Sequence, residues 1–109
     1  MLTGSNVLWS KVDLSTVVDK LSDKLLASMI KKCRPYLKQL NLRGAYRLTH
    51  ASFTLIPGCH NIQDLNLSEC KHLTDELVNL ITTECRILLY LNLAFNSQLT
   101  DASGRYLSK

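Results

Sequence analysis

Three cysteines, Cys33, Cys59 and Cys85, are separated by two intervals of 26 residues, and this spacing constrains the fold more than any other feature. Each cysteine is followed by three apolar residues in a fixed pattern, and the first copy carries one additional residue. The three sets are Leu37, Leu40 and Leu42, then Ile62, Leu65 and Leu67, then Leu88, Leu91 and Leu93. Self-similarity with a period of about 20 to 50 residues indicates stacked structural repeats.

The local pattern within each copy predicts one strand followed by one helix. A Leu-Asn-Leu segment at 40–42, 65–67 and 91–93 alternates as a half-buried strand does. Three residues after each segment stand Ala45, Cys70 and Asn96, where a small or polar side chain can bond the loop backbone. Thr49, Thr74 and Thr100 then follow a leucine, and threonine is a good residue to cap a helix. We therefore expect helices to begin at these three threonines, and the first to end at Pro57-Gly58.

Apolar residues at three- and four-residue intervals predict the buried face of each helix. They are Phe53, Leu55 and Ile56 in the first copy and Leu77, Leu80 and Ile81 in the second. Upstream, Val12-Asp13-Leu14 resembles a strand and Leu21-Ser22-Asp23 a helix start, before an apolar stripe of Leu25, Leu26, Met29 and Ile30. We interpret residues 12–32 as a degenerate capping repeat, followed by repeats 33–58, 59–84 and 85–109.

A strand and a helix of this length bury their apolar edges only against the next copy. The predicted fold is therefore α/β, a leucine-rich-repeat solenoid: a short horseshoe segment with parallel strands on the concave face and helices outside. Gly104 takes the place of the bulky Phe53 and Val78, so we expect the last repeat to leave an exposed edge.

Composition and charge exclude several classes of protein. The chain has 109 residues, 46% of them hydrophobic, and a net charge of +4. Its apolar runs fall far short of the roughly 20 residues that span a bilayer, and its start lacks the pattern of a secretory signal. The basic cluster Lys31, Lys32, Arg34 and Lys38 is expected to be a solvated helix end. We expect a cytoplasmic or nuclear protein that binds neither nucleic acid nor membrane.

The cysteines and histidines suggest two kinds of chemistry, each with a simpler explanation. Cys59-His60 and Cys70-Lys71-His72 raise the alternative of a zinc site, but close Cys-x-x-Cys pairs are missing. Cys70 with His72 or His50 lacks the glycine-rich turn and the third group of a nucleophilic site. The repeat period accounts for the cysteines as small buried residues, and disulfides are not expected in a reducing compartment. We predict no enzyme, no cofactor and no metal site.

Side chains that point off the strands away from the helices are the candidate partner-binding residues. Tyr90 and Phe95 are the strongest candidates because aromatic residues often anchor interfaces, and Arg43 offers a charge-assisted contact. The asparagines have an alternative interpretation as repeat-consensus residues that tolerate solvent, and Phe95 has one as a packing residue. The complete set is Gln39, Asn41, Arg43, Asp64, Asn66, Ser68, Tyr90, Asn92 and Phe95.

Several segments resemble the F-box and leucine-rich-repeat protein family. Residues 61–75, NIQDLNLSECKHLTD, look like that family's cysteine-containing repeat, and so do residues 40–44, LNLRG. Residues 8–14, LWSKVDL, look like the end of an F-box, with Trp9 as its aromatic residue. On this basis residues 1–14 are interpreted as an N-terminal tail and the end of an F-box-like region, which leaves the F-box proper absent.

The resemblance implies an adaptor of a cullin-type ubiquitin ligase, in which the F-box docks onto a Skp1-type linker and the repeats select the substrate. Without an upstream F-box, we expect no binding to the Skp1-type linker. The resemblance also implies an alternative function, a structural scaffold in a larger assembly such as the ciliary dynein regulatory complex, which would add a ciliary location. The remaining, remote alternative is the zinc-binding domain.

Overall fold

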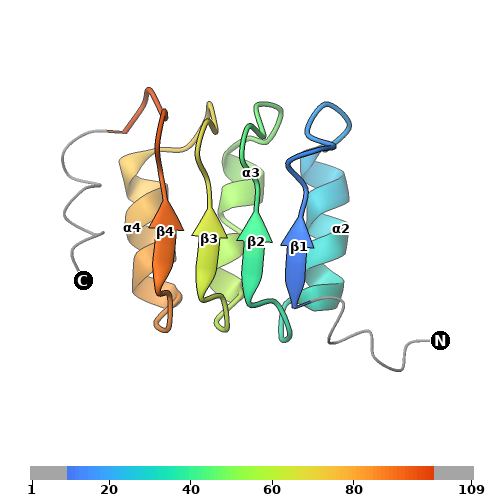
Figure 1. Cartoon of the computed structure of the whole chain (residues 1–109), viewed down its shortest axis with the longest axis vertical. Helices are drawn as coiled ribbons and strands as arrows, with labels where there is room; N and C mark the ends of the chain where they lie inside the picture. Colours follow the sequence, from blue (N-terminus) through green and yellow to red (C-terminus); the bar gives the residue numbers. More distant parts are fainter. Residues whose placement is uncertain (1–9, 100–109) are drawn as a thin grey trace.

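The described part of this computed structural model, residues 10–99, is an α/β fold built on one parallel sheet. The strands lie in chain order: β1 (Lys11–Asp13), β2 (Gln39–Asn41), β3 (Asp64–Asn66) and β4 (Tyr90–Asn92). The connections contain helix α2 (Asp23–Cys33), the short helix α3 (His50–Phe53), the 3₁₀ turn η1 (Ile56–Gly58) and helix α4 (Asp75–Glu84). Figure 1 shows that the helices cover one face of the sheet and leave the other face open. The predicted α/β class with parallel strands is confirmed.

The strands pair in a strict register. Leu40 in β2 lies opposite Val12 on one side and Leu65 on the other, and Leu65 in turn lies opposite Leu91. Equivalent residues of successive copies therefore stand side by side across the sheet. The observed strands begin and end one residue earlier than the predicted 40–42, 65–67 and 91–93, a difference within the usual uncertainty of strand ends.

The capping residues set where the helices begin. The side chains of Ser22, Thr49 and Thr74 each accept a hydrogen bond from a backbone N–H of the first helical turn, at Leu25, Ala51 and Leu77. An extended capping residue that satisfies one of these otherwise unpaired N–H groups fixes the start of a helix. The predicted starts at Ser22, Thr49 and Thr74 are confirmed, whereas the one at Thr100 lies outside the described residues.

The prediction of one continuous helix ending at Pro57 was wrong for the first copy. Helix α3 stops at Phe53, and the separate turn η1 begins at Ile56 with Pro57 in its first turn. Proline has no N–H to bond the carbonyl four residues earlier, and it disfavours helical geometry in the residue before it. The chain therefore leaves the α-helix before Pro57 and closes the copy with a tighter 3₁₀ turn.

The core lies between the sheet and the helices. Leu40 and Leu65 reach it from β2 and β3, Leu42 and Leu67 from the residues directly after these strands, and Phe53 from the last position of α3. From the other helices Leu26, Ile30, Leu77, Val78 and Ile81 are buried in the same cluster. Helix α2 packs on α3, and α4 packs on η1.

Two residues predicted to face the core do not. Leu25 of α2 and Leu80 of α4 are both exposed, whereas their neighbours Leu26 and Ile81 are buried. The sheet presents only a narrow surface to each helix. The stripe of apolar residues on the helix is therefore one residue wider than the part of it that is buried. No helix within residues 10–99 combines the length and the apolar character needed to cross a bilayer.

Candidate partner-binding face

Two rows of side chains run across the open face of the sheet, and the strand register defines both. The first row contains Lys11, Gln39, Asp64 and Tyr90, and the second contains Asp13, Asn41, Asn66 and Asn92. We call these eight residues the sheet face. A hollow of about 320 Å³ lies over β1, β2 and β3 between the rows. The structure thus brings together six of the predicted site residues: Gln39, Asn41, Asp64, Asn66, Asn92 and, at the end of its row, Tyr90.

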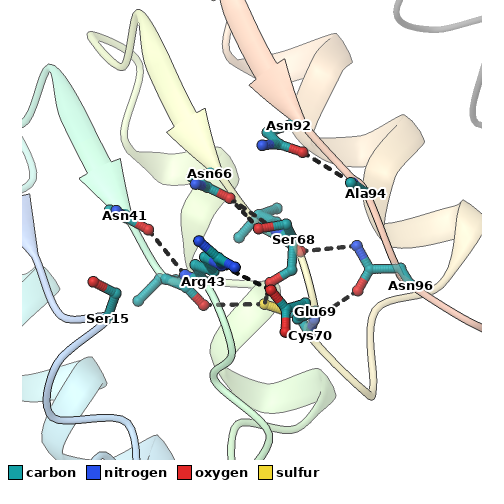
Figure 2. Close-up of polar contacts among 12 residues, drawn as sticks. Ser15, Asn41, Arg43, Asn66, Ser68, Glu69, Cys70, Asn92, Ala94 and Asn96 are labelled. Atoms are coloured by element: carbon teal, nitrogen blue, oxygen red, sulfur yellow. Dashed lines mark hydrogen bonds and ion pairs between the residues drawn. The ribbon is translucent and has the colours of Figure 1, made fainter.

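The asparagines of the second row have a structural task at the ends of their strands. The Oδ1 atoms of Asn41, Asn66 and Asn92 each accept a hydrogen bond from the backbone N–H two residues later, at 3.0 Å in all three cases (Figure 2). This side-chain-to-backbone bond imitates a backbone turn and directs the chain out of the strand. It supports the interpretation of these residues as part of the repeat itself, and their partner-binding role stays a prediction.

Asp13 extends the same row into the first strand. Its Oδ1 accepts from the backbone N–H of Ser15 at 3.0 Å and from the Ser15 hydroxyl at 2.6 Å. These hydrogen bonds hold the pKa of the Asp13 carboxyl below its ordinary value, because they favour the charged form. Sequence reasoning did not include Asp13 in the row, although its position between Val12 and Leu14 matches that of the three asparagines.

Ser68 is not available to a partner, and its selection as a site residue was wrong. Only 3% of its surface is exposed. Its hydroxyl donates to Asn66 Oδ1 at 2.6 Å, and Figure 2 shows the side chain folded back toward the strand. The alternation rule predicts which face a strand residue occupies, but Ser68 lies beyond the end of β3, where the alternation no longer applies.

The loops that leave the strands share an uncommon backbone conformation. Gly44, Glu69 and Phe95 occupy matching positions, three residues after the last residue of β2, β3 and β4, and their φ angles are 77°, 57° and 61°. Glycine adopts this left-handed region freely, whereas other L-residues do so at a cost. The turned backbone lets the N–H of Gly44 bond the Ser68 carbonyl and that of Glu69 bond the Ala94 carbonyl, each at 2.9 Å.

These loops carry the other two predicted site residues. Arg43 Nε lies 2.7 Å from Glu69 Oε2 in an exposed ion pair, so part of its donor capacity is already used (Figure 2). Phe95 is 85% exposed and borders a second hollow of about 530 Å³ with Arg43, Glu69 and Lys71. Among residues 10–99, therefore, Phe95 is not packed into the core.

Tyr90 borders a different hollow, of about 510 Å³, at the β4 side of the sheet. Asp64, Asn66 and Asn92 line it with Tyr90 and Leu89. Tyr90 and Leu89 are 67% and 69% exposed. The two predicted aromatic anchors thus belong to separate hollows, Tyr90 near the start of β4 and Phe95 beyond its end.

The side chains of Cys70 and Asn96 tie their two loops to the preceding copy. Cys70 Sγ contacts the Leu42 carbonyl at 3.2 Å. Asn96 Nδ2 donates to the carbonyls of Leu67 and Leu93 at 2.8 and 2.9 Å, and its Oδ1 accepts from the Cys70 N–H at 2.7 Å. The expectation that Cys70 and Asn96 bond loop backbone is confirmed, and Ala45 is simply buried.

The four cysteines, Cys33, Cys59, Cys70 and Cys85, are free thiols in buried positions. Burial raises the pKa of Cys59 to about 12 and those of Cys70 and Cys85 to about 11, because it penalises the thiolate. A high pKa disfavours both nucleophilic attack and metal ligation. Within the described range, no three His, Cys, Asp or Glu side chains group in a way that would hold a metal ion.

Comparison with known proteins gives a fold but no family. No family model matches the chain. A chain in the crystal structure of the Rad7 and Elc1 complex in yeast is similar over 88% of this chain, with a TM-score of 0.71 and 20% sequence identity. The chain covers 26% of that longer chain. At this identity the similarity concerns the fold.

Proposed function

We propose that the chain is a protein-binding module of the leucine-rich-repeat solenoid type, which holds its partner with the sheet face and the loops at the strand ends. The observation that most supports this proposal is the exposure of Phe95. This large apolar side chain is 85% exposed, and its backbone is in the left-handed region. A large aromatic side chain that its own fold leaves exposed is typical of an interface anchor, and its left-handed backbone is the loop conformation that Gly44 and Glu69 share at the matching positions.

Three further observations support this proposal. Tyr90, at the end of the first row of the sheet face, and its neighbour Leu89 expose a second apolar area. Aromatic residues surrounded by polar groups are the usual energetic centres of protein interfaces. The similar solved chain belongs to a complex of two proteins, which favours a protein partner for this fold. Each copy contributes one strand, and the strands of successive copies pair in register. This arrangement favours the solenoid.

Two variants test the binding role. The double variant Tyr90→Ala with Phe95→Ala is expected to weaken the capture of specific partners by about 30-fold or more, the effect of losing an interface centre worth 2 kcal/mol. Its melting temperature should stay close to that of the wild type, since both side chains are exposed. The matched control is Tyr46→Ala, because Tyr46 is half exposed but lies outside the sheet face.

Capture is measured by quantitative mass spectrometry of proteins retained on the immobilised chain. A lowered melting temperature with unchanged capture would mean that Tyr90 and Phe95 are packing residues and would refute the proposed surface. Leu65→Ala provides the opposite control. Leu65 is fully buried, so its truncation should cost about 2 to 5 kcal/mol of folding stability and abolish capture by unfolding.

At the finer level we propose that the bound protein is a substrate presented for ubiquitination, as the resemblance to F-box and leucine-rich-repeat proteins implies. The alternative is a scaffold subunit of a larger assembly. Depletion of the protein separates the two roles. An adaptor predicts that captured partners become longer-lived and less ubiquitinated, whereas a scaffold predicts that the remaining subunits lose abundance together.

A further inference from the structure

The edge of the molecule opposite the strand-end loops collects basic side chains from all three copies. The residue directly after each periodic cysteine is basic: Arg34, His60 and Arg86. Lys31 and Lys32 in the last turn of α2 and Lys38 before β2 add to them. We call these six residues the basic edge. Figure 1 shows the three connections that carry them side by side, where the helices end and the strands begin.

Contacts between neighbouring connections hold this arrangement together. Asn61 Nδ2 donates to the Pro35 carbonyl at 2.8 Å, and His60 Nδ1 lies 3.3 Å from the Glu84 carbonyl. Below them, Cys85 Sγ lies 3.5 Å from the Cys59 carbonyl. Each connection is therefore fixed to the next, and Arg34, His60 and Arg86 follow one another along the edge.

The basic side chains are exposed, and none of them makes an ion pair within the part of the chain that the structure describes. All six residues are exposed. Within residues 10–99, the side chains of Lys31, Lys32, Arg34, Lys38 and Arg86 make no ion pair. Cations at helix ends offset the helix dipole, which accounts for the charges at the end of α2 and for Arg86 just beyond the end of α4. It does not account for Lys38, which directly precedes β2.

The basic edge also has a hollow of its own. A depression of about 570 Å³ lies between Lys31, Arg34, Pro35, Gly58, His60 and Asn61. Pro35 and Gly58 line it together with the basic residues, and the side chain of Arg34 comes within 3.6 Å of the place where a Gly58 Cβ would stand. Small, mostly apolar depressions bordered by cations suit a peptide side chain with carboxylates on either side.

We propose that the basic edge is a second binding surface, distinct from the sheet face, and that it takes an extended acidic peptide segment of a partner protein. Neighbouring strands lie about 4.8 Å apart, so Arg34 and Arg86, which are two copies apart, are separated by roughly 10 Å along the edge, with His60 between them. In an extended peptide, alternate side chains recur at about 6.6 to 6.8 Å. Flexible arginine and lysine side chains can span the difference between this spacing and the spacing of the cations on the basic edge. Several such pairs together give specificity and faster association.

Fluorescence polarisation with a labelled ten-residue peptide of alternating Glu and Ser tests the proposal. The wild-type chain should bind this peptide and not its Gln-Ser counterpart, and the affinity should fall as salt is raised. The double variant Arg34→Ser with Arg86→Ser should bind at least tenfold more weakly. Lys20→Ser with Lys24→Ser removes the same charge from exposed positions away from the basic edge and should change the affinity less than twofold.

Three results would overturn the proposal. One is equal weakening by the two double variants, which would indicate attraction by net charge alone. Another is tighter binding of an oligothymidylate or of phosphatidylserine vesicles than of the peptide. The third is no peptide binding by the wild type at millimolar concentration. The variant Tyr90→Ala with Phe95→Ala should bind the peptide normally, so failure of the sheet-face proposal is distinguishable from failure of this one.

Discussion

Substitutions at the matching loop positions Gly44 and Phe95 test whether the backbone there is left-handed. We predict that Gly44→Ala destabilises the chain by about 1 kcal/mol, the left-handed penalty of about 1 to 2 kcal/mol less the entropy that alanine removes from the unfolded chain. No atom lies within 4 Å of a Cβ added at Gly44, where φ is 77°, so crowding contributes nothing and the effect comes from the backbone alone.

Gly58→Ala is the matched control for the same chemical change. Its φ lies outside the left-handed region, and the added Cβ would meet the Arg34 side chain at an ordinary contact distance of 3.6 Å. We expect this variant to be neutral or more stable by up to about 1 kcal/mol, because alanine restricts the unfolded chain. The two glycines should therefore respond in opposite directions.

Urea denaturation followed by circular dichroism measures both variants. With an m-value of about 2 kcal/mol/M, Gly44→Ala should lower the unfolding midpoint by about 0.5 M. A comparison at Phe95 adds an independent check, because Phe95→Gly should be more stable than Phe95→Ala by up to about 1 kcal/mol. Equal midpoints for Gly44→Ala and Gly58→Ala, or a higher midpoint for Gly44→Ala, would refute the left-handed conformation at this position.

Two further predictions concern titratable groups. Burial raises the pKa of Cys59 to about 12. At pH 8 a thiol reagent should therefore label the four cysteines slowly in the native chain and fully in urea. Rapid labelling of all four native thiols would contradict their burial. Burial raises the pKa of Asp23, but hydrogen bonds from Ser52 and Thr49 outweigh it and hold this pKa below the ordinary value. The charged form therefore stabilises the fold above pH 4 or so, and this contribution should be lost as the pH falls further. The unfolding free energies of the wild type and Asp23→Asn should converge as the pH falls below about 4 and through the lowered pKa of Asp23, and a difference independent of pH would show that the carboxylate charge is unimportant.

The sequence also suggested the connections that the structure makes between neighbouring copies, though only in part. Cys70 and Asn96 were expected to bond loop backbone, and both do. Nothing suggested that Asp23 would accept hydrogen bonds from the Thr49 backbone and hydroxyl at 2.9 and 2.6 Å, which link α2 to the start of α3. The repeat period could have indicated this contact, because Asp23 and Thr49 are 26 residues apart.

The sequence by itself determined the features that depend on short-range rules. Alternating leucines placed the strands within one residue, and Ser22, Thr49 and Thr74 placed the helix starts, because a capping side chain acts within three residues of itself. The period of the cysteines placed the copies side by side, since equivalent residues of a parallel stack must align.

Only the tertiary structure decided the features that depend on the neighbouring copy. It turned Glu69 and Phe95 into the left-handed region, where the Glu69 N–H reaches the Ala94 carbonyl of the next copy. It buried Ser68, exposed Leu80 and placed Tyr90 and Phe95 in separate hollows. The physical reason is that exposure and loop conformation follow from how much surface the adjacent unit covers, a quantity that no residue pattern within one repeat contains.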